Sequence, residues 1–299
     1  MQTIHLYLGA HKTATTHLTG IMNANRDVLA KSGTTLSTPG DVRKEWLPKL
    51  FSLVRDKREG NAFPEDVVAE VQAAQPATGN WILSEENMVG VASDLKRPGG
   101  IYRFGQKRIA MMKTMFPNAK IKLFFSIRSF ETYYRSMYSE EVRNGGYLPF
   151  SEYYKPHLYE DRSWTETLSR FTNVLPEEDI VLWRFEDFRQ VMPTILRKMT
   201  GIDDVDAMIA KYERGTTRPS LSQKTLDLLG ELAPAIGKKK ALELTEKINR
   251  HYAVADGHAP FQPFDDATVA SMREKYDADF SELVQRFPNM DVVRAKADA

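Results

Sequence analysis

Short apolar runs that alternate with helical patterns are the feature that most constrains the fold of this chain. The runs cover residues 4–8, 81–83, 121–127 and 180–183. Near-continuous apolar runs of this length are typical of strands buried on both faces, as in parallel sheets. Apolar residues at helical spacing lie between them, over 15–31, 104–116, 130–142 and 164–174. The alternation predicts a three-layer α/β/α fold with a central, mostly parallel sheet and helices on both faces.

The rest of the chain predicts helical additions to this sheet. Residues 41–75 are charged and helix-prone, which indicates a helical insertion outside the sheet. Ser220 to Gln223 reads as a capping box that starts a helix through Leu232, and a last helix is expected over 266–287, after a loop at 255–264. We therefore expect one domain over 1–299, with an insertion at about 41–75 and a helical C-terminal part at about 220–299.

The composition excludes several classes of function. The 41 Lys and Arg residues nearly balance the 40 Asp and Glu residues, so no global field favours a nucleic-acid partner. The chain has no cysteine, which excludes disulfides, thiolate chemistry and the common zinc frameworks. Because the start has no basic segment before a long apolar stretch, and no run approaches about 20 apolar residues, we expect no signal peptide, no membrane span and a cytoplasmic location.

The stretch GAHKTATTHLTG, residues 9–20, follows the first apolar run and indicates an anion site. A helix that begins here presents unpaired N–H groups and the positive end of its dipole, and Lys12 and the threonines add a charge and hydroxyl donors. Alternatively, the threonines only cap the helix and Lys12 is solvated. An ordinary nucleotide-binding Walker loop is disfavoured, because His11 stands where that motif has glycine.

Polar residues also follow the other three apolar runs. They are Ser84-Glu85-Glu86-Asn87, Arg128-Ser129 and Arg184-Phe185-Glu186-Asp187. Because ligands bind beyond the carboxyl ends of the strands in an open parallel sheet, we expect these cations, hydroxyls and carboxylates to gather in one region. Arg128 and Ser136, eight positions apart, form a candidate pair for a second phosphate.

These motifs resemble the sulfotransferases that use 3′-phosphoadenosine 5′-phosphosulfate (PAPS). Lys12-Thr13-Ala14-Thr15-Thr16 is similar to the family's 5′-phosphosulfate loop, and Arg128 with Ser136 is similar to its 3′-phosphate site. The resemblance covers roughly residues 4–188. It implies a fold like that of P-loop-containing nucleotide hydrolases, PAPS as the co-substrate, 3′,5′-adenosine bisphosphate as the product and no metal. It also implies that His11, Lys12, Thr13, Ala14, Thr15, Thr16, Arg128 and Ser136 bind the nucleotide.

The resemblance further implies roles in the reaction. Lys12 is expected near the bridging oxygen of the donor, and Glu86 is favoured over Glu85 as the base, although one of the two carboxylates can instead be a plain acid at a helix start. Arg218 is the best candidate for a late basic loop that covers the nucleotide, with a solvated loop as the alternative. Ala14 stands where the family often has glycine, and it fits if its φ angle is negative.

The resulting hypothesis is a sulfotransferase that moves a sulfuryl group from PAPS to a hydroxyl or amine of an acceptor. The acceptor is a small molecule or a glycan, with carbohydrate and lipid among the candidates, and the sequence specifies neither its identity nor the oligomeric state. Two alternatives stay open. One is a P-loop kinase that uses ATP and Mg²⁺, with Glu186 or Asp187 as the metal carboxylate. The other is a non-catalytic nucleotide-binding protein of the same fold.

Overall fold

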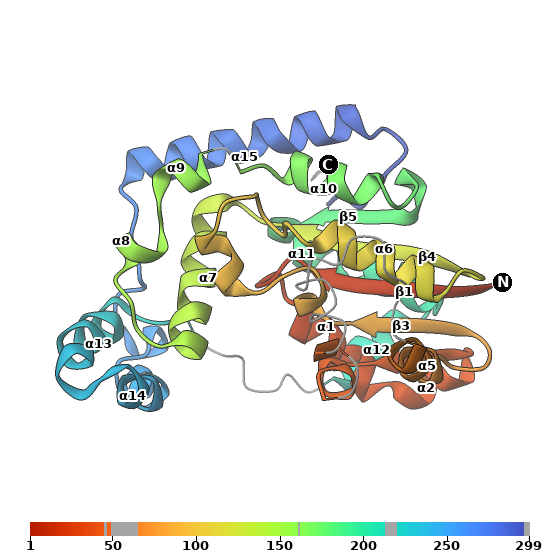
Figure 1. Ribbon diagram of the computed structural model, residues 1–299, viewed down its shortest axis with the longest axis horizontal. Coiled ribbons are helices and arrows are strands. Elements are labelled where there is room, and N and C mark those ends of the chain that lie inside the picture. The colour runs from red at the N-terminus through yellow and green to blue at the C-terminus, as the bar shows by residue number, and fades with distance from the viewer. Residues whose placement is uncertain (45–46, 49–64, 161, 213–219, 296–299) are drawn as a thin grey trace.

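The computed structural model describes residues 1–44, 47–48, 65–160, 162–212 and 220–295 and is built on one six-stranded sheet (Figure 1). The strand order is β2-β3-β1-β4-β5-β6, and every neighbouring pair is parallel. The strands are β1 (Gln2–Gly9), β2 (Thr34–Ser37), β3 (Asn80–Ser84), β4 (Ala119–Ile127), β5 (Ile180–Arg184) and β6 (Asp291–Val292). The predicted fold class, with its mostly parallel central sheet, is confirmed.

Strand β1 lies in the middle of the sheet and is buried on both faces. Ile4, Leu6 and Leu8 belong to one hydrophobic cluster, whereas Tyr7 belongs to a second cluster on the opposite face. Such double burial explains why this strand reads as a continuous apolar run. After β1 the chain first forms β2 and β3 on one side and then crosses to β4 and β5 on the other. This reversal opens a crevice at the carboxyl end of β1, where parallel α/β sheets bind ligands.

Helices cover both faces of the sheet and make it the middle of three layers. Residues of α1, α2, α11 and α12 pack in the cluster around Tyr7, and residues of α5, α6, α7, α10 and α15 pack in the cluster around Leu6. These helices span α1 (Thr15–Ala24), α2 (Arg26–Lys31), α5 (Glu65–Ala73), α6 (Gly105–Met115), α7 (Phe130–Gly145), α10 (Trp164–Thr172), α11 (Phe188–Thr200), α12 (Val205–Lys211) and α15 (Asp266–Arg286).

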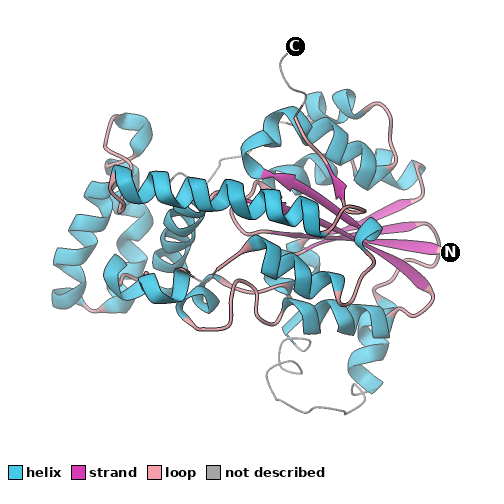
Figure 2. Cartoon of the chain, turned by 90° about the horizontal axis from the view of Figure 1, so that it is seen from above, coloured by secondary structure: helices cyan, strands magenta, loops and turns pink. Residues whose placement is uncertain are grey.

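The C-terminal part extends the fold to one side of the sheet. Figures 1 and 2 both show α13 (Gln223–Ile236) and α14 (Lys238–His251) beyond α7, on the side away from the strands. The long helix α15 then runs back along the same layer as α10, toward β6. The described chain also has three short α-helices, α3 (Pro39–Val42), α8 (Phe150–Tyr153) and α9 (Pro156–Tyr159). Among the described residues, no helix is long and apolar enough to cross a membrane.

The structure differs from the sequence prediction in several elements. The helix predicted over 15–31 is divided at Asn25, whose side-chain amide donates to the carbonyls of Ile21 and Met208 at 2.8 and 2.9 Å. Such side-chain to backbone bonds compete with the helical pattern. The C-terminal helix predicted from a capping box at Ser220 begins later, because Ser222 accepts from the N–H of Thr225 and so caps α13, which continues to Ile236. Strands β2 and β6 were not predicted.

Parts of two other predictions lie outside the described residues. The insertion at about 41–75 is described at its ends, where it forms the last residues of α3 and all of α5. Residues 49–64 lie outside the description. The organisation of the chain as one domain over 1–299 stays a prediction.

Candidate active site at the carboxyl edge of the sheet

The loop between β1 and α1 presents a row of backbone N–H groups at the carboxyl end of β1. Lys12 and Ala14 both adopt left-handed backbone conformations, with φ angles of 62° and 64°. Within the described chain, no group accepts a hydrogen bond from the backbone N–H groups of residues 12–16. Alternation of left-handed residues makes successive N–H groups converge, and α1 adds its dipole. The loop therefore has the form of an anion-binding nest at a helix N-terminus.

The left-handed conformation of Ala14 contradicts the expectation of a negative φ angle. Ala14 occupies the N-cap position of α1 without a side-chain cap, so its backbone has to turn the chain into the helix. A left-handed conformation costs about 1–2 kcal/mol for a residue with a Cβ atom. The position thus demands the backbone freedom that glycine would supply, and the alanine is held there by its surroundings.

The side chains of the loop have different partners. The buried Thr13 hydroxyl donates to the carbonyl of Ala10 at 2.6 Å and so closes the turn. The Thr15 hydroxyl donates to Glu86 Oε2. Thr16 is exposed, and its hydroxyl makes no hydrogen bond to any described residue. Of the three threonines, only Thr16 therefore has a hydroxyl without a partner in the described chain, whereas Thr13 and Thr15 offer their backbone N–H groups to an anion.

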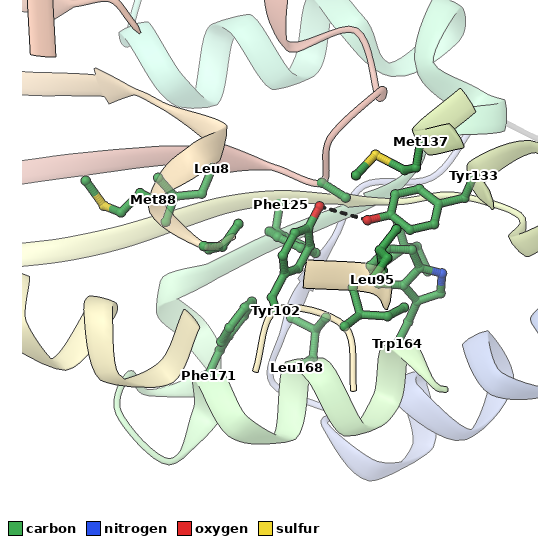
Figure 3. Close-up of a cluster of buried hydrophobic side chains, with 14 of the residues drawn as sticks. Leu8, Met88, Leu95, Tyr102, Phe125, Tyr133, Met137, Trp164, Leu168 and Phe171 are labelled. Carbon is green, nitrogen blue, oxygen red and sulfur yellow. Dashed lines mark hydrogen bonds between the residues drawn. The ribbon is translucent and has the colours of Figure 1, made fainter. Parts of the chain in front are cut away.

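His11 is turned away from the nest and anchors the loop to the core. Its backbone N–H donates to the hydroxyl of Tyr102 at 2.8 Å, and its Nδ1 lies 2.9 Å from the same hydroxyl. Its Nε2 lies 3.0 Å from Asn87 Oδ1. The Tyr133 hydroxyl donates to that of Tyr102 at 3.1 Å, and Figure 3 shows these two side chains pointing toward one another within the core. The ring of His11 is therefore held between the Tyr102 hydroxyl and the Asn87 side-chain oxygen.

Arg128, the residue that follows β4, is a half-buried guanidinium whose hydrogen bonds go to groups that carry no charge. Its Nη1 donates to the carbonyl oxygen of Lys12 at 2.5 Å, and its Nε donates to Thr132 Oγ1 at 2.9 Å. The ring of Phe185 lies 4.5 Å below its Cζ. Burial lowers the pKa of Arg128 to about 10, so the group stays charged at neutral pH. No carboxylate of the described chain forms an ion pair with it.

Ser136 lies on the flank of α7 that faces the loop. Thr132, Ser136 and Glu140 follow one another at intervals of four residues and therefore share one side of the helix. Thr132 contacts Arg128, and Glu140 Oε2 lies 3.2 Å from Lys12 Nζ. Ser136 therefore lies between the two cations, although no hydrogen bond joins it to Arg128 in the structure.

The two adjacent carboxylates after β3 differ in their surroundings. Glu85 is fully buried and accepts from Nε and Nη2 of Arg43 at 2.7 and 2.9 Å. Burial raises the pKa of Glu85, and the Arg43 pair opposes that shift. Glu86 lies beside the loop, where it accepts from Thr15, and 25% of its side chain is exposed. Only Glu86 combines a position next to the loop with access to solvent.

A cavity of about 370 Å³ opens beside Glu86, between α1 and α3. Its lining includes the polar side chains of Thr16, Thr19, Ser84, Arg43 and Glu86. A larger cleft of about 1100 Å³ lies between α7, α8, α9 and the start of α15, and it is lined by aromatic residues such as Phe130 and Tyr134. These two project from a different flank of α7 than Ser136 and Glu140. The smaller cavity is therefore the one that adjoins the loop.

Some predicted site residues cannot be placed, and others were missed. Arg218 lies outside the described residues. Within the described chain, no cluster of His, Asp and Glu has the arrangement of a metal site. Glu140, Arg43 and Phe185 contact the predicted residues but were not singled out. Glu140 follows Ser136 by one helical turn, which is a signal that the sequence carries, whereas nothing local marks Arg43 as the partner of a carboxylate 42 positions away.

Comparisons with known proteins give weak structural likenesses. No family model and no curated protein matches the sequence. The chain is similar to a sulfotransferase from Alicyclobacillus acidocaldarius, with 16% identity, a TM-score of 0.40 and coverage of 80% of this chain and 93% of that one. It is also similar to a retinol dehydratase in complex with androsterone and the inactive cofactor PAP, with 10% identity, a TM-score of 0.38 and coverage of 96% and 83%. At these TM-scores, any function has to rest on the geometry of the site.

Proposed function

We propose that the chain is a sulfotransferase that binds PAPS and transfers its sulfuryl group to a hydroxyl or amine of an acceptor. The observation that carries the proposal is the half-buried Arg128, which forms no ion pair with a carboxylate of the described chain and donates to the carbonyl of Lys12. A guanidinium that is partly removed from water without an ion-paired anion loses solvation, and a phosphate ligand would supply a charged partner. The hydrogen bond to the Lys12 carbonyl supports a second anion site next to the loop.

Two adjoining anion sites favour a nucleotide with phosphate groups on two sides of its ribose. In the proposal, the N–H groups of residues 12–16 hold the 5′-phosphosulfate, and Arg128 with Ser136 holds the 3′-phosphate. ATP carries all its phosphates at one end and leaves Arg128 without an anion. Glu186, a candidate metal carboxylate of a kinase, accepts from the N–H of Ser129 at 2.9 Å and from the hydroxyl of Tyr276 at 2.8 Å. These contacts disfavour the kinase alternative.

The proposed reaction breaks the S–O bond of the donor and forms a new S–O bond, or an S–N bond with an amine acceptor. The acceptor oxygen or nitrogen attacks the sulfur in line, the bond from sulfur to the bridging oxygen breaks, and 3′,5′-adenosine bisphosphate leaves with the electron pair. Lys12 stabilises the charge that grows on the bridging oxygen, and the nest holds the phosphate in place. The acceptor proton passes to a carboxylate, which the proposal assigns to Glu86 because it adjoins the loop, whereas Glu85 is buried against Arg43.

The cavity beside Glu86 is the proposed acceptor site. Its volume of about 370 Å³ accommodates a small molecule or one unit of a glycan. The hydroxyls of Thr16, Thr19 and Ser84 and the charges of Arg43 and Glu86 suit a hydroxyl-bearing acceptor better than an apolar one. The acceptor itself is best found by transfer from labelled PAPS into a cell extract.

Thermal unfolding with nucleotides tests the proposed function. The protein is heated alone, with 3′,5′-adenosine bisphosphate, with ADP, and with ATP and Mg²⁺. The bisphosphate should raise the melting temperature most, because a ligand at about 100 times its Kd adds about 2.7 kcal/mol to the unfolding free energy. An equal shift with ADP, or no shift with the bisphosphate, would overturn the proposal. A larger shift with ATP and Mg²⁺ would favour a kinase.

A further inference from the structure

A carboxylate that the proposed reaction does not use holds the ammonium of Lys12. Glu140 Oε2 lies 3.2 Å from Lys12 Nζ. The other oxygen, Oε1, accepts from the side-chain amide of Asn144 at 2.8 Å, one helical turn further along α7. That amide also donates to the Glu140 carbonyl at 3.0 Å, so it fixes the carboxylate relative to the helix. Asn144, Glu140 and Lys12 thus form a chain of contacts that ends at the anion-binding loop.

We propose that Glu140 is a positioning residue for product release, which takes back the Lys12 ammonium after sulfuryl transfer and so weakens the hold on 3′,5′-adenosine bisphosphate. The inference rests on the proposed function. When the bridging bond breaks, the former bridging oxygen gains negative charge, and Lys12 binds the product more strongly than it binds the donor. A second anion within reach of Lys12 opposes that gain.

The surroundings make Glu140 an effective competitor for Lys12. The Lys12 and Glu140 side chains are only 25% and 20% exposed, so water screens their attraction less than at the open surface. The charge of Glu140 also raises the pKa of Arg43, although less than the charges of Glu85 and Glu86 do. The Glu140 charge therefore also acts on Arg43, which lines the cavity beside Glu86. Because Asn144 already holds it, the carboxylate needs little rearrangement to accept Lys12 again.

Binding of 3′,5′-adenosine bisphosphate to Glu140→Gln tests the inference. Glutamine keeps an oxygen for Asn144 but removes the charge. We expect the Kd for the bisphosphate to fall about tenfold, mainly through slower dissociation measured by stopped flow, because affinity changes within one site act chiefly on the dissociation rate. The difference should shrink at high salt. Asn144→Ala is a second variant, in which the Kd should fall less.

Two controls separate this role from a general effect of charge. Glu246→Gln removes a carboxylate that pairs with Arg143 of α7 at 2.7 Å and is 54% exposed, and it should leave the Kd unchanged. In a Lys12→Ala background, Glu140→Gln should have little effect, because the competition needs both partners. An unchanged or weaker affinity in Glu140→Gln, or an equal gain without Lys12, would overturn the inference. If the wild-type protein binds no bisphosphate, the proposed function fails instead.

Discussion

The two halves of the sheet's carboxyl edge hold their arginine side chains in opposite ways. In the donor half, formed by Lys12, Arg128 and Ser136, the half-buried guanidinium of Arg128 contacts a carbonyl, a hydroxyl and an aromatic ring, and no carboxylate of the described chain forms an ion pair with it. In the acceptor half, formed by Arg43, Glu85 and Glu86, the guanidinium makes two bonds to one carboxylate. The Arg128 charge is left for a ligand to satisfy, whereas the Arg43 charge is satisfied within the fold.

The difference indicates which residues are structural and which are free to act. Glu85 neutralises Arg43 and accepts from the N–H of Asn87 at 2.8 Å, so it fixes the turn after β3. Glu86 is the next residue, and it accepts from the hydroxyl of Thr15 in the loop, while Arg43 Nη2 lies farther away, at 4.0 Å from its Oε1. Neighbouring residues of the same type thus have different roles within the acceptor half, because Glu85 is buried and Glu86 is partly exposed beside the loop. Substitutions of one residue at a time in either half can test which residues act in the reaction and which stabilise the fold.

The largest effect is expected within the donor half, where Lys12 and Arg128 should affect different quantities. Lys12→Ala should lower turnover about 10²- to 10³-fold, because a charge aimed at the leaving group acts mainly in the transition state. Arg128→Ala should weaken binding of 3′,5′-adenosine bisphosphate about 10- to 100-fold through the loss of charged hydrogen bonds. Transfer from labelled donor and calorimetric titration measure the two quantities. Equal losses of turnover and affinity in both variants would contradict separate roles.

A smaller effect should distinguish the two carboxylates of the acceptor half. Glu86→Gln should lower transfer about 10²-fold through the loss of a general base, with the unfolding free energy changed by less than about 0.5 kcal/mol. Glu85→Gln should lower the unfolding free energy by about 2 kcal/mol, because it breaks the pair with Arg43 in a buried position. Urea denaturation gives the stabilities. The opposite pattern, with a stable but inactive Glu85→Gln, would make Glu85 the base.

The strands that the sequence predicts are those that are buried on both faces and therefore consist mostly of apolar residues. Strands β1, β3, β4 and β5 are covered on both faces and read as apolar runs, whereas β2 has the residues TTLS and lies at an edge of the sheet. Strand β6 has only two residues and forms through its ladder with β5. Edge strands of this kind depend on a neighbour and carry little local signal.

The candidate site also has residues that the sequence predicts and contacts that it does not. Lys12, the threonines and Arg128 follow predicted strands, so topology alone brings them to one edge. The pairing of Lys12 with Glu140 joins residues 128 positions apart, and only the packing of α7 against the loop brings it about. The sign of the φ angle at Ala14 also depends on distant contacts, because the Ala10 N–H donates to the carbonyl of Ser126 at 2.8 Å and fixes the start of the loop.

The smallest expected effect concerns the backbone at Ala14, where substitution by glycine should stabilise the protein and not destabilise it. Ala14→Gly should raise the unfolding free energy by roughly 0.5 kcal/mol, because relief of about 1 kcal/mol of left-handed strain exceeds the extra entropy that glycine adds to the unfolded chain. Ala270→Gly is the matched control, since Ala270 is exposed in the interior of α15, and it should lose about 1 kcal/mol. Urea denaturation of both variants compares the signs. An equal decrease of the unfolding free energy in Ala14→Gly and Ala270→Gly would contradict the prediction. It would mean that the left-handed conformation of Ala14 carries no strain that glycine can relieve.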